Sequence, residues 1–426
     1  MRTSPKTWIL AAAAAAGFAA GTALHPVAWP ADWRLGDLIA RAGSGDPGKA
    51  AARAAGRCAG LAGTDARDCY ERFLVPIARA RGPKAALDAL TRLTALDHGV
   101  LVIAHDYAHA IGVASYLAHP DVARIFPECS VDFQSGCYHG VIQAYFMRRG
   151  ADDSASVRAL CVPFIADGAY GWLRFQCAHG MGHGLTMLLD HDLPAALAKC
   201  DYLADGWDRE SCYGGAFMEN VVSASQPAHD MGLGHGHDMM PGMRMDGPKF
   251  KQVDRTDPTY PCSVLADRYQ AACWENQASV IEFITDWNVA RAAAGCDRAP
   301  SKYVRWCYIG LGTDFNGKAL SDPAQALAMC DRTNATWREW CYVGAAKNLV
   351  EVGAQPAAGM RFCALVTRAP WKMRCYEGLG EEISSVTDVT TERERYCRES
   401  EAPYVEACRY GARVRADRPP GLTAPD

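Results

Sequence analysis

The sequence predicts an all-α protein, a solenoid of helical repeats that are linked by disulfide bonds. Three observations support this fold class: the cysteines fall into successive pairs, the pairs recur with a fixed period, and helical patterns lie on either side of a pair. From Cys262 onward, the first cysteine of a pair recurs every 33 or 34 residues. Such a period is typical of repeat proteins, in which each unit buries its apolar face only against its neighbours. We therefore expect helix–turn–helix units of about 33–39 residues.

The 18 cysteines of this 426-residue chain can form one disulfide per pair. Since an even, regularly spaced set of cysteines persists as disulfides only outside the reducing cytosol, we expect an exported protein. Closing a loop of about 11 residues stabilises a fold by on the order of 3 kcal/mol. Spacing alone leaves other connectivities open, and we expect the sequential one. The successive pairs are Cys58/Cys69, Cys129/Cys137, Cys161/Cys177, Cys200/Cys212, Cys262/Cys273, Cys296/Cys307, Cys330/Cys341, Cys363/Cys375 and Cys397/Cys408.

Residues 1–23 have the pattern of an export signal. Arg2 and Lys6 precede an apolar, alanine-rich run over residues 8–24, and small residues at 21–23 offer a cleavage site. An uncleaved membrane anchor is the alternative, because an apolar run of about 17 residues is at the short limit for a membrane span. We expect a periplasmic or extracellular location, with membrane contact only through this segment. The net charge of −4 gives no support for nucleic acid as a partner.

The rest of the chain divides according to the repeat pattern. In the unit that ends at Cys330, Asp322 and Pro323 have the features of a helix N-cap and first helical residue, and helical periodicity resumes at Trp337. The first cysteine of a pair thus ends one helix and the second begins the next. We expect a linker at 24–50, histidine-bearing repeats at 51–223, a loop at 224–257, C-terminal repeats at 258–415 and a disordered tail at 416–426.

The second cysteine of most pairs begins a four-residue motif, Cys-aromatic-X-Gly, in which X varies. Glycine inside a helix costs about 1 kcal/mol relative to alanine, so its repetition implies that neighbouring helices approach closely there. We expect the aromatic side chain to pack on the disulfide or on the next helix. Copies of the motif, some with one departure from it, start at Cys137, Cys177, Cys212, Cys273, Cys307, Cys341 and Cys375.

The period, the cysteine placement and the aromatic-plus-glycine step resemble the Sel1-like branch of the tetratricopeptide-type repeats. The similarity is to the secreted, cysteine-rich members of that branch, and it extends from Cys129 to Cys408. The resemblance implies that a disulfide joins adjacent helices in each repeat. It implies no activity, since solenoids of this kind host many functions.

The histidines are confined to the first part of the chain. All 12 lie before residue 238, although the repeats continue beyond residue 400. His105 and His109 are spaced i, i+4, as are His179 and His183, and this spacing places two imidazoles on one helical face. His139 and His179 occupy the X position of successive motifs, so they should be neighbours in a solenoid.

These histidines predict a metal site on adjacent helices. Imidazole ligands at this spacing suit zinc, copper, iron or nickel, and the shortage of carboxylates disfavours magnesium and calcium. Asp106, Gln143 and Glu219 are candidate outer ligands, partners of the ligands or proton carriers. The alternative is that each histidine caps or hydrogen-bonds within a tightly packed helix. The predicted ligands are His105, His109, His139, His179 and His183.

The longest interruption of the cysteine rhythm, between Cys212 and Cys262, contains a loop rich in histidine and methionine. Thioethers select Cu(I) and imidazole accepts both copper states, so this composition suggests copper capture or delivery. A surface loop of biased composition, a lid over the histidine cluster and a docking or oxidant-sensitive segment are the alternatives. The candidate loop ligands are His229, Met231, His235, His237, Met239, Met240, Met243 and Met245.

Three functions remain open from the sequence. The first is an exported protein that binds a transition metal, with copper preferred and zinc or iron next. The second is a metal-dependent oxidase or hydrolase that uses the same histidines, and the third is a structural or protein-docking solenoid whose concave face binds a partner. The sequence lacks Cys-x-x-Cys-His, His-Glu-x-x-His and a serine nucleophile elbow, so covalent haem, zincin proteases and serine hydrolases are not indicated.

Overall fold

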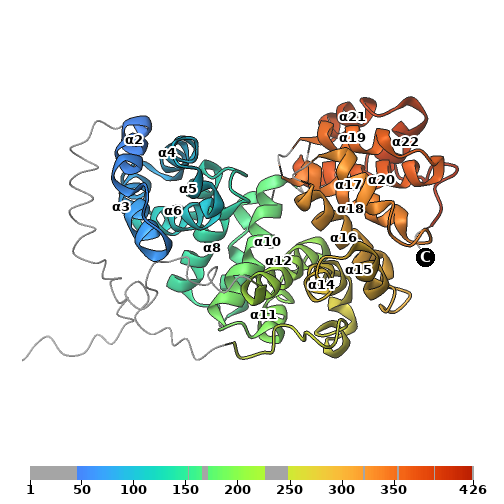
Figure 1. Cartoon of the computed structure of the whole chain (residues 1–426), viewed down its shortest axis with the longest axis horizontal. Coiled ribbons are helices and arrows are strands. Elements are labelled where there is room, and N and C mark those ends of the chain that lie inside the picture. Colours follow the sequence, from blue (N-terminus) through green and yellow to red (C-terminus); the bar gives the residue numbers. More distant parts are fainter. Residues whose placement is uncertain are drawn as a thin grey trace, which may run out of the picture.

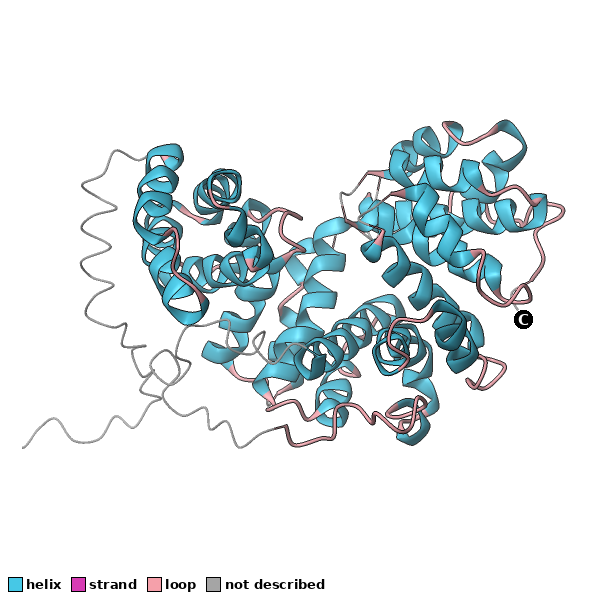
Figure 2. Ribbon diagram, in the orientation of Figure 1, coloured by secondary structure: helices cyan, strands magenta, loops and turns pink. Residues whose placement is uncertain are grey.

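The computed structural model describes residues 46–151, 153–165, 171–225, 248–319, 322–352, 355–387 and 389–424. Within these ranges the protein is all-helical and has no strand, as the sequence predicts (Figures 1 and 2). The first helices are α2 (Pro47–Cys58), α3 (Gly63–Arg81), α4 (Pro83–Leu96), α5 (His98–Val102), α6 (Ala104–Ala118), α7 (Val122–Ile125), α8 (Gly136–Arg149), α9 (Ser154–Ala159), α10 (Trp172–Leu188), α11 (Leu193–Cys200) and α12 (Gly206–Ser225). The later helices are α14 (Gln270–Ile284), α15 (Val289–Cys296), α16 (Val304–Lys318), α17 (Pro323–Cys330), α18 (Arg338–Glu351), α19 (Pro356–Leu365), α20 (Ala369–Val386), α21 (Thr390–Arg398) and α22 (Val405–Gly411).

The long helices pack against one another in chain order. Helix α6 contacts α8, α8 contacts α10, α10 contacts α12, and the series continues through α14, α16, α18, α20 and α22. In Figure 1 the colours accordingly run from the blue helices at one end, through green α10 and α12, to the red helices at the other end. Helix α10 also touches α20, which lies much later in this order. The described part of the chain contains no helix with both the length and the apolar character that a membrane span requires.

All nine predicted disulfides are present, and each joins the two cysteines of one sequential pair. Their Cα atoms are 5.4 to 5.8 Å apart, within the usual range for a disulfide. Helix α17 ends at Cys330, which is bonded to Cys341 at the start of α18, so the bond links two helices across a corner. The sequential pairing is thereby confirmed, and a chain with this many disulfides belongs in an oxidising environment.

The aromatic residue of the motif ties the same corner with a hydrogen bond. The hydroxyl of Tyr308 donates to Asp297 at 2.8 Å, and Asp297 directly follows the first cysteine of that pair. Tyr213 donates to Asp201 at 2.5 Å in the same way, and Tyr342 donates to Asp331. Each of these three rings is buried, so the corner is held by a covalent bond and a buried tyrosine together.

The motif glycine meets the X residue of the preceding long helix. A Cβ atom added to Gly344 would lie 1.9 Å from the carbonyl oxygen of Ile309, which is the X residue of α16. The same contact joins Gly140 to His109 at 2.0 Å. No side chain fits at such a distance, so glycine is required where the backbones touch. As a result, X residues of successive long helices lie beside one another. Equivalent contacts join Gly215 to His179, Gly310 to Glu275 and Gly411 to Glu377.

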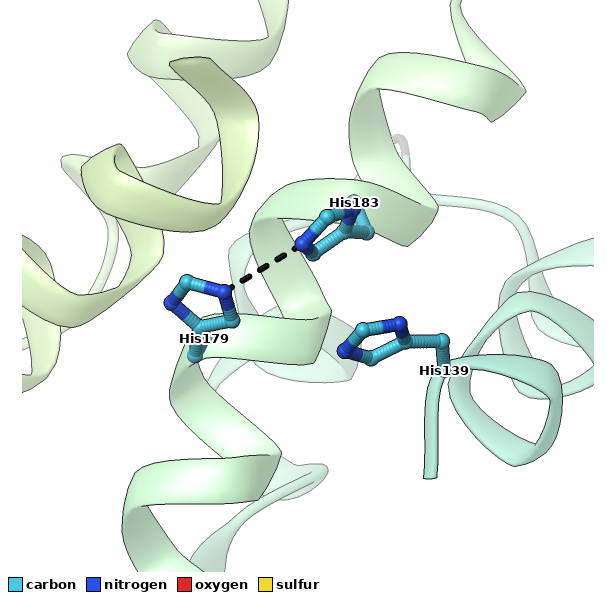
Figure 3. A group of neighbouring side chains, drawn as sticks. All are labelled: His139, His179 and His183. Carbon is cyan, nitrogen blue, oxygen red and sulfur yellow. Dashed lines mark hydrogen bonds between the residues drawn. The ribbon is translucent and has the colours of Figure 1, made fainter. Parts of the chain in front are cut away.

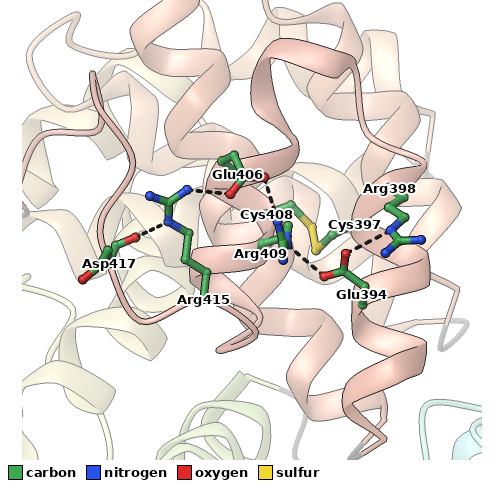
Figure 4. Close-up of polar contacts among 8 residues, drawn as sticks. All are labelled: Glu394, Cys397, Arg398, Glu406, Cys408, Arg409, Arg415 and Asp417. Carbon is green, nitrogen blue, oxygen red and sulfur yellow. Dashed lines mark hydrogen bonds and ion pairs between the residues drawn. A yellow bond between two sulfur atoms is a disulfide. The ribbon is translucent and has the colours of Figure 1, made fainter.

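The last corner shows how the C-terminus is fixed (Figure 4). The disulfide Cys397–Cys408 joins α21 to α22, and Glu394 accepts from Arg409 across the corner at 2.8 Å. Arg415 donates to Glu406 at 2.5 Å and, through Nε, to the carbonyl oxygen of Asp417 at 2.6 Å. The segment that follows α22 is therefore connected to the corner between α21 and α22.

Two predicted boundaries need correction. The tail at 416–426 is not disordered over its described residues: Leu422 is only 7% exposed, and buried Arg374 donates to the carbonyl oxygen of Thr423 at 2.7 Å. An apolar side chain and a buried guanidinium that needs acceptors hold the tail against α20. Helix α2 also begins at Pro47, inside the predicted linker, because the side chain of Asp46 caps it.

Some predictions concern residues outside the described ranges. These are the export signal at 1–23, most of the predicted linker, and the histidine- and methionine-rich part of the 224–257 loop. Residues 224 and 225 belong to α12, and the chain from residue 248 packs against that helix, since Asn220 donates to the carbonyl oxygen of Gln252 at 2.9 Å. All eight candidate copper ligands of the loop lie in the undescribed part.

Substituting the motif glycine should destabilise the fold. We expect Gly344→Ala to lower the free energy of unfolding by about 1–3 kcal/mol, because its methyl group would overlap the Ile309 carbonyl. Gly317→Ala is the matched control, since nothing lies within 4 Å of a Cβ there and alanine is the better helix former by up to about 1 kcal/mol. Thermal unfolding followed by circular dichroism measures both, and equal melting temperatures for the two variants would contradict the close-contact account.

Candidate metal centre

Five histidine rings from three successive long helices, α6, α8 and α10, form one continuous group. His105 and His109 come from α6, His139 from α8, and His179 and His183 from α10. The ring centroids of His105 and His139 are 5.6 Å apart, those of His139 and His183 are 4.3 Å apart, and those of His179 and His183 are 5.1 Å apart. The contacts between neighbouring X positions thus bring together histidines that are far apart in the sequence.

Three of the five rings are close enough to share one ion. The ligand atoms of His139, His179 and His183 all lie within 4.8 Å of one another (Figure 3). The Nε2 atoms of His179 and His183 are 3.3 Å apart. Two nitrogens that bind a tetrahedral ion at ~2.0–2.1 Å are about 3.3 Å from each other, so this pair already has the spacing of bound ligands. Binding would draw His139 toward His179, whose ring centroid is 6.2 Å from that of His139.

The hydrogen bonds of His179 and His183 direct both Nε2 lone pairs to the same point. Nδ1 of His183 donates to Oε2 of Glu219 at 2.8 Å, and Glu219 is fully buried. Nε2 of His179 faces His183, whereas its Nδ1 is on the side of α12, 3.7 Å from the point where a Cβ of Gly214 would stand. The backbone of Ser211, also in α12, raises the pKa of His179, which is the effect of a carbonyl acceptor. A neutral imidazole whose Nδ1 carries the hydrogen has its lone pair on Nε2. Two lone pairs that face each other at this distance favour a cation between them.

His139 has a buried nitrogen that no described group satisfies. Its side chain is 6% exposed, and among the described residues Nε2 has no hydrogen-bond partner. Leaving such an atom unpaired costs about 1–3 kcal/mol, so a ligand there would be favourable. Gln143, one turn further along α8, is 7% exposed and its Oε1 is also without a partner among these residues.

Small residues on the neighbouring helices make room for the rings. A Cβ on Gly180 would lie 3.4 Å from the ring of His139, and one on Gly215 would lie 3.3 Å from the ring of His183. At Gly214 the motif places glycine at the X position, and the ring of His179 lies 3.7 Å from the point where a Cβ would stand. A larger residue at these positions would occupy the space of an imidazole.

Burial and the repulsion of neighbouring rings keep His139 and His179 neutral. Burial lowers the pKa of His139 well below its ordinary value, and the neighbouring rings of His183, His105, His179 and His109 lower it further. Burial and His183 lower the pKa of His179 to about 3, against a smaller opposing effect of the Ser211 hydrogen bond. Neutral imidazole is the form that binds a metal, so no proton has to be displaced from either ring at pH 7.

The other predicted site residues separate into two groups. Glu219 contacts a ligand candidate directly, whereas Asp106 forms an ion pair with Arg67 of α3. His105 and His109 are adjacent to the triad but are not part of the group within 4.8 Å. The effect of the Ser211 backbone on the pKa of His179 could not be expected from the sequence, because a backbone group leaves no signal in the residue type.

The neutral histidines should make stability depend on pH in a defined direction. Their folded pKa lies below the unfolded value of about 6.5, so below pH 6.5 the unfolded chain binds more protons. We expect the metal-free protein to lose up to about 1.4 kcal/mol per pH unit for each neutral histidine as the pH falls from 6.5 toward 3.

Buried carboxylates act in the opposite direction, since burial raises the pKa of Glu71 and Glu382 to about 8. The informative quantity is therefore the difference in the pH dependence of the melting temperature between the wild type and the double variant His139→Val/His179→Ile. The replacement residues are those at the X positions of other helices, valine in α18 and isoleucine in α16. Melting temperatures from pH 7 to pH 4 should fall more steeply for the wild type. Parallel profiles would show that the histidines are not held neutral.

Comparisons with protein-family models, with curated proteins and with solved structures find nothing that matches this chain. The resemblance to Sel1-like repeats therefore stays an expectation. Function has to be argued from the histidine cluster itself.

Proposed function

We propose that the protein binds a transition-metal ion through His139, His179 and His183, with copper as the preferred metal and zinc next. The observation that carries this proposal is the pair of Nε2 atoms of His179 and His183 that face each other at 3.3 Å while Nδ1 of His183 donates to the buried Glu219. Neutral imidazoles suit copper, zinc and iron, and the Irving–Williams order places Cu²⁺ above Zn²⁺ for a given nitrogen site.

Glu219 supports the proposal because it acts on a ligand and not on the ion. A carboxylate behind a metal-binding histidine fixes the tautomer and orientation of the ring and raises its basicity. Glu219 is in this relation to His183, at 2.8 Å and fully buried. A structural histidine would gain from the same hydrogen bond, but it would not need a second histidine lone pair opposite its Nε2.

The proposed scaffold is an exported solenoid. Helices that pack in chain order and a contact that recurs from repeat to repeat support this architecture. The nine disulfides and the signal-like residues 1–23 support export to a periplasmic or extracellular location. In such a compartment the cysteines are oxidised and are not metal ligands, and the group of ligand atoms that lies within 4.8 Å among the described residues consists of histidines alone.

Metal-dependent catalysis is a second candidate, and the ligand number favours it. Three histidines leave a coordination position open, as in catalytic zinc sites, where bound water becomes a nucleophile near pH 7. His179 is only half-buried, which places the cluster near the surface. Hydrolysis of an activated ester by the zinc-loaded protein, lost in His183→Ala, would support this role; loaded protein without turnover would leave binding as the function.

Metal binding should depend on the three histidines. We expect metal-free protein to bind Cu²⁺ and Zn²⁺ in isothermal titration calorimetry, with elemental analysis confirming the bound metal. His179→Ile and His139→Val should each weaken binding by at least ~100-fold, because each removes one of the three ligands. Both substitutions use residues that equivalent positions of the chain already hold, namely Ile309 and Val343.

The matched control is His119→Ala, since His119 is exposed and lies outside the cluster. It should bind metal like the wild type. If the wild type binds no metal, or if the two cluster variants bind as tightly as His119→Ala, metal binding by the triad is refuted and the protein-docking solenoid becomes the favoured interpretation.

Removing the charge of Glu219 should have a smaller effect. Glu219→Gln keeps the shape of the side chain but weakens the hydrogen bond to Nδ1 of His183. We expect metal affinity to fall about 10–100-fold, the usual effect of losing the partner of a ligand. The dissociation constant for Zn²⁺ measures it, and an unchanged value would show that Glu219 does not tune the site.

A further inference from the structure

The metal triad leaves two of the clustered histidines without a role. His105 and His109 lie one turn apart on α6, with their ring centroids 6.2 Å apart. Nδ1 of His105 is 3.0 Å from the carbonyl oxygen of Phe133. A carbonyl only accepts, so Nδ1 carries the hydrogen and the lone pair of His105 is on Nε2. His105 therefore has the same tautomer as the two histidines on α10.

His139 is adjacent to both histidine pairs. Helix α8 packs between α6 and α10, and the ring of His139 is 5.6 Å from that of His105 and 4.3 Å from that of His183. An imidazole has two nitrogens on different edges of the ring, and both can bind a metal once the N–H proton is lost. Nε2 of His139 has no hydrogen-bond partner among the described residues.

The ring separations on the α6 side are close to those of ligands that share an ion. Two imidazoles on a tetrahedral ion have centroids roughly 5–5.5 Å apart, given metal–nitrogen distances of ~2.0–2.1 Å. The observed 5.6 Å between His105 and His139 and 6.2 Å between His105 and His109 are wider than this. The ligand atoms of His105, His109 and His139 are not all within 4.8 Å of one another, so a second ion requires these rings to turn toward a common point. The i, i+4 spacing on α6 also matches that of His179 and His183 on α10, and it is the spacing of a helical chelate.

The position of α10 that corresponds to His105 holds phenylalanine. Gly112 of α6 and Gly182 of α10 make the same contact, since a Cβ on either would lie 2.1 Å from a cysteine carbonyl oxygen of the next long helix. Aligned on these glycines, His105 corresponds to Phe175 and His109 to His179. An aromatic ring is thus sufficient for packing at this point, and an imidazole adds a metal ligand.

We propose that the chain holds two metal ions side by side, the second bound by His105, His109 and His139, with His139 shared between the two positions. This proposal rests on the proposed function of the triad. When both ions are bound, each nitrogen of His139 binds one ion and the ring releases its N–H proton to solvent. The ligand class is a pair of first-row transition ions that accept imidazole nitrogen, such as Cu²⁺ or Zn²⁺.

Zinc titration of the full chain tests the number of positions. Calorimetry and elemental analysis should find about two Zn²⁺ per wild-type chain. The double variant His105→Phe/His109→Ile takes its residues from Phe175 and Ile309, so it should fold, with circular dichroism as the check. It should bind about one Zn²⁺, with the remaining dissociation constant within ~3-fold of the wild-type triad value. His139→Val should weaken both positions.

Each failure has a distinct meaning. One Zn²⁺ per chain in both the wild type and the double variant would overturn the second position and leave the triad intact. No Zn²⁺ in the wild type would overturn the triad itself. With two Cu²⁺ per chain, an imidazolate bridge couples the spins, so the electron paramagnetic resonance signal should fall well below that of two isolated ions. An electron paramagnetic resonance signal of full intensity from both Cu²⁺ ions would refute the sharing of His139.

Discussion

The contact between a glycine of one long helix and a backbone carbonyl of its neighbour is the constraint on which the rest of the structure depends. It joins α6 to α8, α10 to α12, α14 to α16, α16 to α18 and α20 to α22, and at these pairs it fixes how far apart the helices are and how they are aligned. Because the carbonyl belongs to the X residue in most of these contacts, X side chains on successive helices emerge beside one another. His139 is beside His109 for this reason. Between α8 and α10 the motif glycine Gly180 instead leaves room for the ring of His139, 3.4 Å from the point where a Cβ would stand, so that ring lies beside the histidines of α10.

The disulfide corners hold this contact in place. Each bond between sequential cysteines stabilises its corner by on the order of 3 kcal/mol, and buried tyrosines such as Tyr308 add hydrogen bonds to the same corners. This rigidity matters at the cluster, because several neutral imidazoles packed together lose solvation and, for His139, a hydrogen bond. A loosely held set of histidines would separate and become hydrated. The scaffold therefore pre-organises the lone pairs for a cation.

Much of the fold could be predicted from the sequence, because the cysteine period and the motif glycine are local signals. The nine sequential bonds and the all-helical class followed from them. The approach of His139 to His179 was predicted from their shared X position. The division of the five histidines into a triad and an adjacent pair could not be predicted, since it depends on ring rotations and on Ser211 and Glu219 in α12. The ordered tail was missed because Arg374, which binds it, is far away in sequence.

The most direct test of the central claim is the X-ray absorption spectrum of protein loaded with one equivalent of Zn²⁺ or Cu²⁺. The account predicts a first shell of nitrogen at about 2.0 Å with the scattering pattern of about three imidazole rings and no sulfur. A shell that contains sulfur near 2.3 Å, or one that consists of oxygen with fewer than two imidazoles, would contradict it. Such a spectrum would place the metal outside the cluster of His139, His179 and His183.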